Sequence, residues 1–323
     1  MKYRRFGRTG WQVSEIGYGM WGMASWSGSD DSESIKALQR AVDLGCNFFD
    51  TAFAYGNGRS EALLGRLVRG NTDRKLYTAT KVPPKNLQWP AKAGFTLDDC
   101  YPPDHIEEYV NKSLENAGLD KFDLVQLHTW NDDWMDDPRW SEKLDDLKAR
   151  GLVDACGISI NRWEPWNGIR AVRSGKIDAV QVIYNIFDQN PEDELFPACL
   201  EQDVAVIARV PFDEGTLTGN LTLETTFPED DWRHTYFSPD NLRQSVERAE
   251  ALRPLIPNGS SMAETALRFI LNDPAVSTII PGMRKIANVD ANISASDAGP
   301  LSAELQEKLR PHRWIRKPAP WSD

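Results

Sequence analysis

The sequence predicts an α/β fold of the (β/α)8 TIM-barrel type. The first observation is a repeated unit, in which an amphipathic helix and a Gly, Asp or Lys break precede a short apolar strand that ends in a polar residue. The second is that eight such strands follow one another in 323 residues, a length that α/β barrels reach as one unit. The third is that the strands lack apolar–polar alternation, which is typical of parallel strands covered on both faces.

The expected elements can be placed in order along the chain. A small hairpin over residues 1–14, around the turn sequence GRTG, precedes a first strand within Glu15–Trp21. The helix–strand pairs that follow are 29–45 with 47–52, 59–70 with 76–81, 104–122 with 123–128, 141–153 with 154–159, 164–177 with 178–185, 192–203 with 204–210, and 261–276 with 277–282. The Pro-rich segment 311–323 is expected to be an irregular tail, so that residues 1–323 form a single domain.

A doubly wound open sheet is the structural alternative, because strand count alone does not prove closure. However, no GxGxxG follows the first strand, so the nucleotide-binding fingerprint of that fold is missing. Three connections after strands are long, at residues 82–104, 129–140 and 211–240, and they hold five of the 12 tryptophans. Long loops of this composition are more often functional than disordered, and in a barrel they would lie at the C-terminal face.

Composition and charge exclude several classes of function. The net charge of −11 disfavours general binding to nucleic acids or anionic membranes, and no apolar run is long enough for a membrane span. The four cysteines are scattered without a CxxC pair, and the N-terminal residues predict no signal peptide, so a cytoplasmic enzyme with reduced thiols is expected. No His, Cys and Asp set has metal-ligand spacing, so no metal is predicted.

Polar residues end three consecutive strands of the expected barrel. Asp50 closes the second strand, Lys81 the third and His128 the fourth, and Tyr55 lies in the loop beyond Asp50. Strand ends converge on one face of a barrel, so these four side chains are expected to meet there. Taken singly, each also fits an ordinary role as a turn, cap, solvated or packed residue. Their joint placement favours a catalytic site.

The four residue types suit the reduction of a carbonyl group. A tyrosine hydroxyl has a pKa of about 10, and a nearby ammonium favours the tyrosinate and lowers that pKa. A carboxylate paired with the ammonium keeps it charged despite burial. An imidazole on the other side is able to donate a hydrogen bond that orients a carbonyl oxygen. The set predicts a proton donor beside an oxyanion site.

Seven segments together resemble the aldo-keto reductase family: FFDTAFAYG, TATK, LVQLH, GIS, QVIYN, GTLTG and IIPGMRK. They follow the family's order and spacing from the hairpin to about Ala295. This resemblance implies a (β/α)8 barrel that reduces carbonyl compounds with NAD(P)H and has no Rossmann domain. It implies that Tyr55 is the general acid/base, that Lys81 and Asp50 tune it, and that His128 orients the carbonyl.

The resemblance implies NADPH as cofactor, with NADH less favoured. Ser159 and Gln181 would hold the nicotinamide carboxamide, whose donor and acceptor they match. The family has Asn directly after this serine, whereas this chain has Ile160 and then Asn161. Either Asn161 takes that place or one amide contact is lost.

Arg209 stands where the family carries an aromatic ring under the nicotinamide. A guanidinium is planar and able to stack, but its charge disfavours the cationic oxidised nicotinamide relative to the reduced form. The alternative is that Arg209 turns away and pairs with Asp213 or Glu214.

The segment PGMRKIANVDANI (281–293) resembles the part of the family that binds the adenosine 2′-phosphate and the adenine. Arg284 is the expected phosphate partner, because its fork bonds phosphate oxygens bidentately, and Lys285 is able to share this task. Asn288 and Asn292 are expected near the phosphate and the adenine, and the GTLTG loop across the pyrophosphate. The further cofactor contacts that the resemblance implies are Met20, Pro211, Phe212, Leu217 and Gly282.

Trp21 and Trp130 resemble the aromatic residues that line the family's substrate pocket, although either also fits a core position. An aromatic wall indicates a bulky or flat carbonyl compound, or a sugar. The acidic run NDDWMDD near Trp130 is either a solvated loop or a site that recognises hydroxyl groups or cations.

The sequence therefore predicts an NADPH-dependent reductase of an aldehyde or ketone. One alternative is a dehydrogenase that oxidises a sugar or polyol with the same residues. The other is a redox-sensing interaction protein of the potassium-channel β-subunit type, which the intact set of four residues disfavours. The natural substrate, the direction of the reaction and the oligomeric state stay open.

Overall fold

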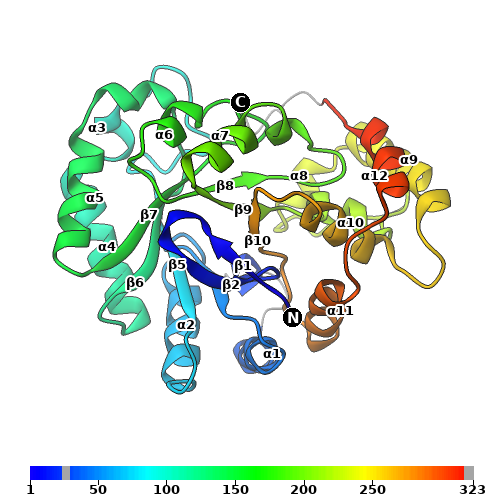
Figure 1. The fold of residues 1–323 in the computed structure, drawn as a ribbon, viewed down its shortest axis with the longest axis horizontal. Coiled ribbons are helices and arrows are strands. Elements are labelled where there is room, and N and C mark those ends of the chain that lie inside the picture. Colours follow the sequence, from blue (N-terminus) through cyan, green and yellow to red (C-terminus); the bar gives the residue numbers. More distant parts are fainter. Residues whose placement is uncertain (24–29, 316–323) are drawn as a thin grey trace.

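A parallel eight-stranded sheet forms the centre of the computed structural model, which describes residues 1–23 and 30–315. Its strands pair in chain order and are β3 (Tyr18–Gly19), β4 (Phe48–Asp50), β5 (Tyr77–Val82), β6 (Phe122–Leu127), β7 (Val153–Ser159), β8 (Ala179–Ile183), β9 (Ala205–Arg209) and β10 (Val276–Ile279). Two isolated parallel bridges, Ile16 to Ile279 and Gly19 to Gly282, join its first and last strands. The sheet is thus a nearly closed barrel, which confirms the predicted fold class (Figure 1).

The seam between β3 and β10 depends on close backbone approach. The N–H of Gly19 donates to the carbonyl of Pro281 at 3.0 Å. A Cβ atom at Gly19 would lie 2.5 Å from the carbonyl oxygen of Ile280, a distance that real Cβ contacts do not reach. A glycine is therefore needed where the barrel closes.

Helices cover the outside of the sheet (Figure 1). The seven that the sequence pattern predicted are α1 (Asp31–Asp43), α2 (Arg59–Arg69), α4 (Pro103–Ala117), α5 (Arg139–Ala149), α6 (Ile169–Arg173), α7 (Leu195–Gln202) and α10 (Met262–Leu271). The structure adds α3 (Leu97–Cys100) and α8 (Arg233–Tyr236) inside the long loops, then α9 (Pro239–Leu252), α11 (Ile286–Asp297) and α12 (Ala303–Leu309). The start of α9 has a clear local signal, because Ser238 caps the N–H of Asn241 and proline occupies the first helical position.

The N-terminal hairpin closes the end of the barrel at which the strands begin. It consists of β1 (Tyr3–Phe6) and β2 (Trp11–Ser14), which confirms the hairpin predicted within residues 1–14. Trp11 stacks on Tyr77, the first residue of β5, with ring centroids 5.0 Å apart. The N–H of Arg8 donates to Asp203, just before β9, at 2.7 Å.

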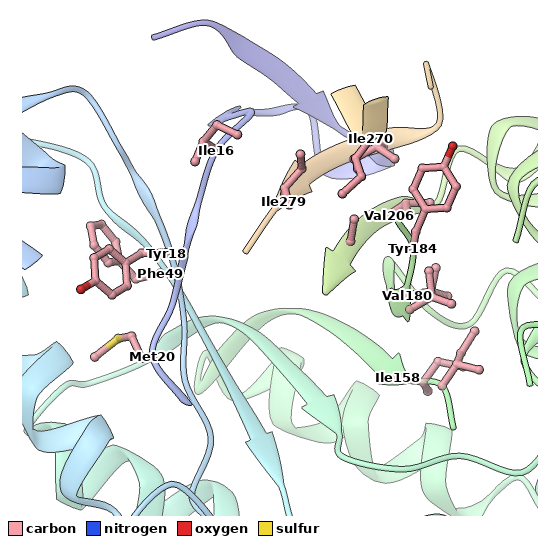
Figure 2. Packing of buried hydrophobic residues seen from close by; sticks show 14 of the residues in the cluster. Ile16, Tyr18, Met20, Phe49, Ile158, Val180, Tyr184, Val206, Ile270 and Ile279 are labelled. Carbon is pink, nitrogen blue, oxygen red and sulfur yellow. The ribbon is translucent and has the colours of Figure 1, made fainter. Parts of the chain in front are cut away.

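Two hydrophobic layers hold the barrel together. The inner layer joins the hairpin to the strand interiors and consists of Phe6, Val13, Phe48, Ala79, Leu124, Ala155, Ala179, Ala205, Ile207 and Ile280. The outer layer lies between sheet and helices, and Figure 2 shows Phe49, Ile158, Val180, Val206 and Ile279 in it. Each strand thus alternates between the two layers with a period of two residues.

The C-terminal segment is described as far as residue 315. Arg310–His312 form a single 3-10 turn, and the N–H of Trp314 donates to the carbonyl of Phe187 at 2.8 Å. Residues 316–323 of the expected irregular tail lie outside the described residues. Within the part of the chain that the structure describes, no helix combines the length and hydropathy needed to cross a membrane.

Candidate active site

Interior positions of the barrel change from apolar to polar along the strands β4 to β9. Asp50 comes two residues after Phe48 on β4, and Lys81 two residues after Ala79 on β5. The polar residues on the same face of the later strands are Gln126 on β6, Ser159 on β7, Gln181 on β8 and Arg209 on β9. Because all strands run in the same direction, these side chains gather in the C-terminal half of the barrel.

Lys81 and Asp50 form a buried ion pair, with side chains 0% and 2% exposed. Lys81 Nζ lies 2.5 Å from Asp50 Oδ1 and donates to the carbonyl of Thr51 at 2.7 Å. The other oxygen of Asp50 accepts from Nε2 of Gln126 at 3.2 Å and of Gln181 at 2.9 Å. Such additional hydrogen bonds are what make a buried ion pair tolerable, so the ammonium group of Lys81 is held in a fixed place.

Tyr55 lies in the turn between β4 and α2. Its N–H donates to the carbonyl of Ala52 at 3.0 Å. The turn continues through Asn57 and Gly58, whose φ values are 49° and 92°, in the left-handed region. This turn brings the Tyr55 hydroxyl to 3.4 Å from Lys81 Nζ.

His128 completes the group of four. Its N–H donates to Val82 on the neighbouring strand at 3.0 Å, which fixes it at the end of β6. Its ring meets the ring of Tyr55 edge-on, with centroids 5.7 Å apart. Its Nδ1 is buried, and no described residue lies within hydrogen-bond distance of it. The four residues singled out in the sequence therefore meet at one end of the barrel.

Burial changes the expected acidity of Tyr55. It raises the pKa of the Tyr55 hydroxyl above 10, and the charge of Lys81 opposes this rise without cancelling it. The expectation of a lowered tyrosine pKa is therefore wrong in its net direction, although the effect of Lys81 has the predicted sign. Burial also lowers the pKa of His128 well below 6.5, with Lys81 and Arg209 adding to the effect. At neutral pH the site holds a protonated tyrosine and a neutral imidazole.

Ser159 and Gln181 are cross-strand partners on β7 and β8. Both are buried, with exposures of 4% and 2%, and the amide nitrogen of Gln181 is bonded to Asp50. Ser159 and Gln181 therefore present a hydroxyl and an amide side by side next to the ion pair.

Asn161 makes its bonds with the protein itself. Its Oδ1 accepts from the N–H of Ala91 at 3.2 Å and from Thr129 Oγ1 at 2.5 Å. Its Nδ2 donates to the carbonyl of Ala91 at 3.0 Å and to Glu164 at 2.9 Å. These bonds favour the second possibility raised by the sequence, in which one amide contact to the nicotinamide is lost.

Arg209 points toward the β7 end and not toward Glu214. Its Nη2 donates to the carbonyl of Ile160 at 3.0 Å, and its Nε is buried without a partner within residues 1–23 and 30–315. Glu214 pairs instead with Arg162 at 2.6 Å, so the alternative pairing of Arg209 with Glu214 is not formed. Burial, reinforced by the charge of Arg162, lowers the pKa of Arg209 to about 10, which leaves it charged at neutral pH.

Arg284 lies between β10 and α11. Its Nη1 is buried and has no hydrogen-bond partner among the residues that the structure describes. Its aliphatic stem packs so closely on Gly22 that a Cβ there would lie 2.9 Å from Cδ of Arg284. The helix that follows has no side-chain cap at Lys285 and no acidic residue in its first turn. An unpaired guanidinium N–H beside an uncapped helix N-terminus fits a phosphate group.

The other predicted cofactor contacts follow strand ends or lie on nearby helices. They are Met20 after β3, Pro211 and Phe212 after β9, Leu217 in the 3-10 helix η5 (Asp213–Thr218), Gly282 after β10, and Asn288 and Asn292 on α11. The side chains of Met20 and Leu217 are fully buried, and Figure 2 shows Met20 near Tyr18 in the core. Neither of these two residues exposes surface to a ligand in this structure.

One predicted substrate residue needs correction. Trp130 is fully buried, packs edge-on against Trp134 and Trp140, and donates from Nε1 to Asp132. It fills the core and offers no surface to a ligand. Trp21 is 41% exposed and available for contact.

The acidic run beside Trp130 supports loop structure. Asp132 also accepts from the N–H of Arg170 at 2.9 Å, and Asp136 pairs with the Arg170 guanidinium at 2.7 Å. Asp137 pairs with Arg139 at 2.6 Å. Among the described residues, no three His, Cys, Asp or Glu side chains are grouped in a way that could hold a metal ion.

Two residues near the site were not singled out in the sequence. Gln126 supports Asp50, and the available signal was an amide in an apolar strand two residues before His128. Trp89 contacts the ring of His128, with centroids 5.5 Å apart. No local pattern marks Trp89, because its contact depends on how the loop after β5 folds.

Comparison with known proteins agrees with this geometry. Residues 15–312 match the model of the aldo/keto reductase family. Aldo-keto reductase YhdN of Bacillus subtilis is 30% identical over 318 residues, which cover 96% of this chain and 92% of that protein. The NADH-specific methylglyoxal reductase of Escherichia coli is 26% identical over 335 residues, covering 96% and 99%.

A solved structure matches over its whole length. Aldo-keto reductase AKR11C1 from Bacillus halodurans, in its holo form, superposes with a TM-score of 0.76 at 27% identity and covers 100% of both chains. With the family model spanning nearly the whole barrel, the chain belongs to the aldo/keto reductase family and is an NAD(P)-dependent oxidoreductase.

Proposed function

We propose that this protein reduces an aldehyde or ketone to an alcohol with NADPH, using Tyr55 as the proton donor. The observation that carries the proposal is the position of the Tyr55 hydroxyl, 3.4 Å from a buried ammonium and on a ring that meets His128. A general acid needs this combination of a bound proton and a nearby charge that stabilises its conjugate base.

The side chains divide the work around the carbonyl oxygen. His128, neutral at neutral pH, donates a hydrogen bond that orients the oxygen. Tyr55 transfers its proton to that oxygen as negative charge develops on it. Lys81 then stabilises the tyrosinate, and Asp50 keeps Lys81 in place until solvent restores the proton. Bound NADPH would supply the hydride that adds to the carbonyl carbon.

Unsatisfied polar groups support the choice of cofactor. The buried Nη1 of Arg284 would bond the 2′-phosphate that distinguishes NADPH from NADH. Ser159 and Gln181 would hold the carboxamide, and Arg209 would lie beside the nicotinamide. The E. coli relative is NADH-specific by name. The preference of this protein for NADPH over NADH is therefore proposed from its own Arg284 and not from sequence similarity.

Absorbance at 340 nm tests the proposal. NADPH is mixed with the protein and a panel of aldehydes, quinones and keto-sugars, and we expect its oxidation with at least one of them. The alcohols that correspond to these carbonyl compounds, mixed with NADP⁺ and the protein, measure oxidation in the reverse direction, which uses the same residues. Tight NADPH binding without turnover of any substrate in either direction would contradict the proposal and favour an interaction protein.

A further inference from the structure

We propose that Trp89 forms a wall of the substrate pocket beside His128, and that Asn161 is the residue that positions it. This inference rests on the proposed carbonyl reduction and deepens it, because it names the part of the substrate that the site would recognise. It concerns the loop after β5 and two residues to which the family resemblance gave no such role.

Trp89 is both in contact with the site and open to ligands. Its ring meets that of His128 edge-on at 5.5 Å, while Tyr55 meets His128 edge-on at 5.7 Å. Trp89 is nevertheless 40% exposed. A large ring that touches the carbonyl-orienting residue and keeps much of its surface open is placed to contact the group attached to a carbonyl carbon.

The loop that carries Trp89 is fixed by a buried polar cluster. The N–H of Ala91 donates to Thr129 Oγ1 at 2.9 Å and to Asn161 Oδ1 at 3.2 Å, and Asn161 Nδ2 donates back to the carbonyl of Ala91 at 3.0 Å. Thr129 Oγ1 also bonds Asn161 Oδ1 at 2.5 Å. All three residues are less than 9% exposed.

This cluster links segments that follow three neighbouring strands of the barrel. Ala91 belongs to the loop after β5, Thr129 directly follows His128 at the end of β6, and Asn161 follows β7. Asn161 binds both backbone groups of Ala91, as a neighbouring strand would, so it fixes the loop two residues from Trp89. The displacement of this asparagine by one position, with Ile160 in between, thus has a consequence for the substrate side of the site.

The chemistry of the wall predicts the substrate class. Trp89 offers a flat apolar surface beside the oxygen-orienting imidazole. Substrates with an aryl group or another flat apolar group next to the carbonyl would gain contact there, whereas a short aliphatic aldehyde would not.

Two substrates distinguish a role of Trp89 in recognising aryl groups from a general effect on activity. The values of kcat/KM with NADPH are measured for 4-nitrobenzaldehyde and for propanal, in the wild type and in Trp89→Ala. We expect Trp89→Ala to lower the aryl-to-aliphatic ratio roughly 10-fold, mainly through KM for the aryl aldehyde. Trp166→Ala is the matched control, because Trp166 is 60% exposed and lies on the connection between β7 and α6. It should leave both values unchanged.

The double variant tests the positioning role of Asn161. Asn161→Ala should lower the same ratio, and Trp89→Ala combined with Asn161→Ala should lower it no further than Trp89→Ala alone. Thr129→Val removes another bond of the cluster with little change of shape, and it serves if Asn161→Ala fails to fold. The dissociation constant of NADPH should stay at its wild-type value in Asn161→Ala and in Thr129→Val.

The outcomes distinguish the possible failures. A wild type that turns over neither aldehyde, nor any member of the carbonyl panel, refutes the proposed function itself. If the wild type is active and Trp89→Ala has the same aryl-to-aliphatic ratio, Trp89 does not form a wall of the substrate pocket. If Asn161→Ala weakens NADPH and leaves the ratio unchanged, Asn161 holds the cofactor and the positioning role is wrong.

Discussion

The hydroxyl of Tyr55 experiences two opposing effects of the same site. Burial raises its pKa, which keeps the proton on the oxygen at neutral pH. Lys81, 3.4 Å away, favours the anion that forms once the proton has left. A proton donor benefits from both, because the first effect keeps it loaded and the second stabilises the charge that develops in the transition state.

Replacing Tyr55 with phenylalanine tests this role directly. We expect kcat to fall roughly 10²–10⁴-fold, the usual contribution of a general acid, with the dissociation constant of NADPH nearly unchanged. Tyr3→Phe is the control, because Tyr3 lies in the hairpin at the opposite end of the barrel, where its hydroxyl donates to the carbonyl of Gly45 after α1. Single-turnover kinetics give the rate. A Tyr55→Phe variant that keeps most of its rate would place the proton donor elsewhere.

Arg284→Ala should separate the two nicotinamide cofactors. The loss of charge-assisted hydrogen bonds worth about 1.5–3 kcal/mol predicts that the NADPH dissociation constant rises roughly 10–100-fold, while that of NADH changes little. Fluorescence titration with both cofactors measures this. Lys285→Ala in parallel shows whether the neighbouring cation shares the task. An equal loss of both cofactors in Arg284→Ala would rule out a role at the 2′-phosphate.

At the scale of single residues, the sequence predicted those positions that the geometry of the strands determines. The approach of Asp50, Lys81 and His128 followed from their positions at strand ends, since parallel strands in a barrel align their ends. The burial of Trp130 and the exposure of Trp89 could not be predicted in this way. Both depend on how long loops fold against one another, and no periodic pattern records that.

Helices α2 and α4 show how tightly the outer layer of the barrel packs. A Cβ atom on Gly65 of α2 would lie 1.7 Å from the carbonyl oxygen of Ala117 at the end of α4. Helix propensity favours alanine over glycine by about 1 kcal/mol, so propensity alone predicts that Gly65→Ala stabilises. The overlap with backbone cannot be relieved by a side-chain rotation, and steric conflict outweighs propensity here.

We therefore expect Gly65→Ala to lower the free energy of unfolding by about 1–3 kcal/mol. Gly70→Ala at the end of the same helix is the control, because its φ is −80° and the nearest atoms to an added Cβ are 3.4–3.5 Å away. Urea denaturation of both variants and the wild type provides the comparison. A Gly65→Ala protein as stable as the wild type would mean that α2 and α4 are spaced differently.

Among the elements, the amphipathic helices and apolar strands were predictable from their periodicity. The capped helix α9 carries a local start signal in Ser238 and Pro239, although both residues fall within the long connection expected at 211–240. The strand β3 is only two residues long, because it pairs with β4 over two residues and meets the segment around β10 only through single bridges. Such a short strand is determined by barrel closure and not by its own sequence.

For the molecule as a whole, the barrel separates stability from chemistry along its axis. The hairpin and the apolar inner layer occupy the end where the strands begin, and the polar groups occupy the other end. Every second residue of a strand faces the barrel interior, so the change from an apolar to a polar interior is visible in the sequence, for example from Phe48 to Asp50. The polar end buries titratable groups, so it should affect how stability depends on pH.

Histidines whose pKa values are lowered by the fold give this dependence its sign. Burial lowers the pKa of His128 well below 6.5, and it also lowers the pKa of His105. Between these folded-state values and 6.5, the unfolded chain binds more protons than the folded chain, so the free energy of unfolding rises with pH. The stabilisation is complete above pH 6.5 and is lost as pH falls toward the folded-state values. Glu214, whose pKa is raised by burial, acts in the opposite direction.

We expect the free energy of unfolding to fall between pH 7.5 and pH 5.5, by up to about 1.4 kcal/mol per histidine for each pH unit below 6.5. His128→Gln should remove more of this pH-dependent loss than His105→Gln, because its pKa is lowered further. Urea unfolding at both pH values measures the loss, and comparing the change within each protein cancels the cost of the substitution itself. If His128→Gln retains the full wild-type loss, His128 is not held neutral by its surroundings. The neutral, oxygen-orienting imidazole of the proposed mechanism would then have to be abandoned.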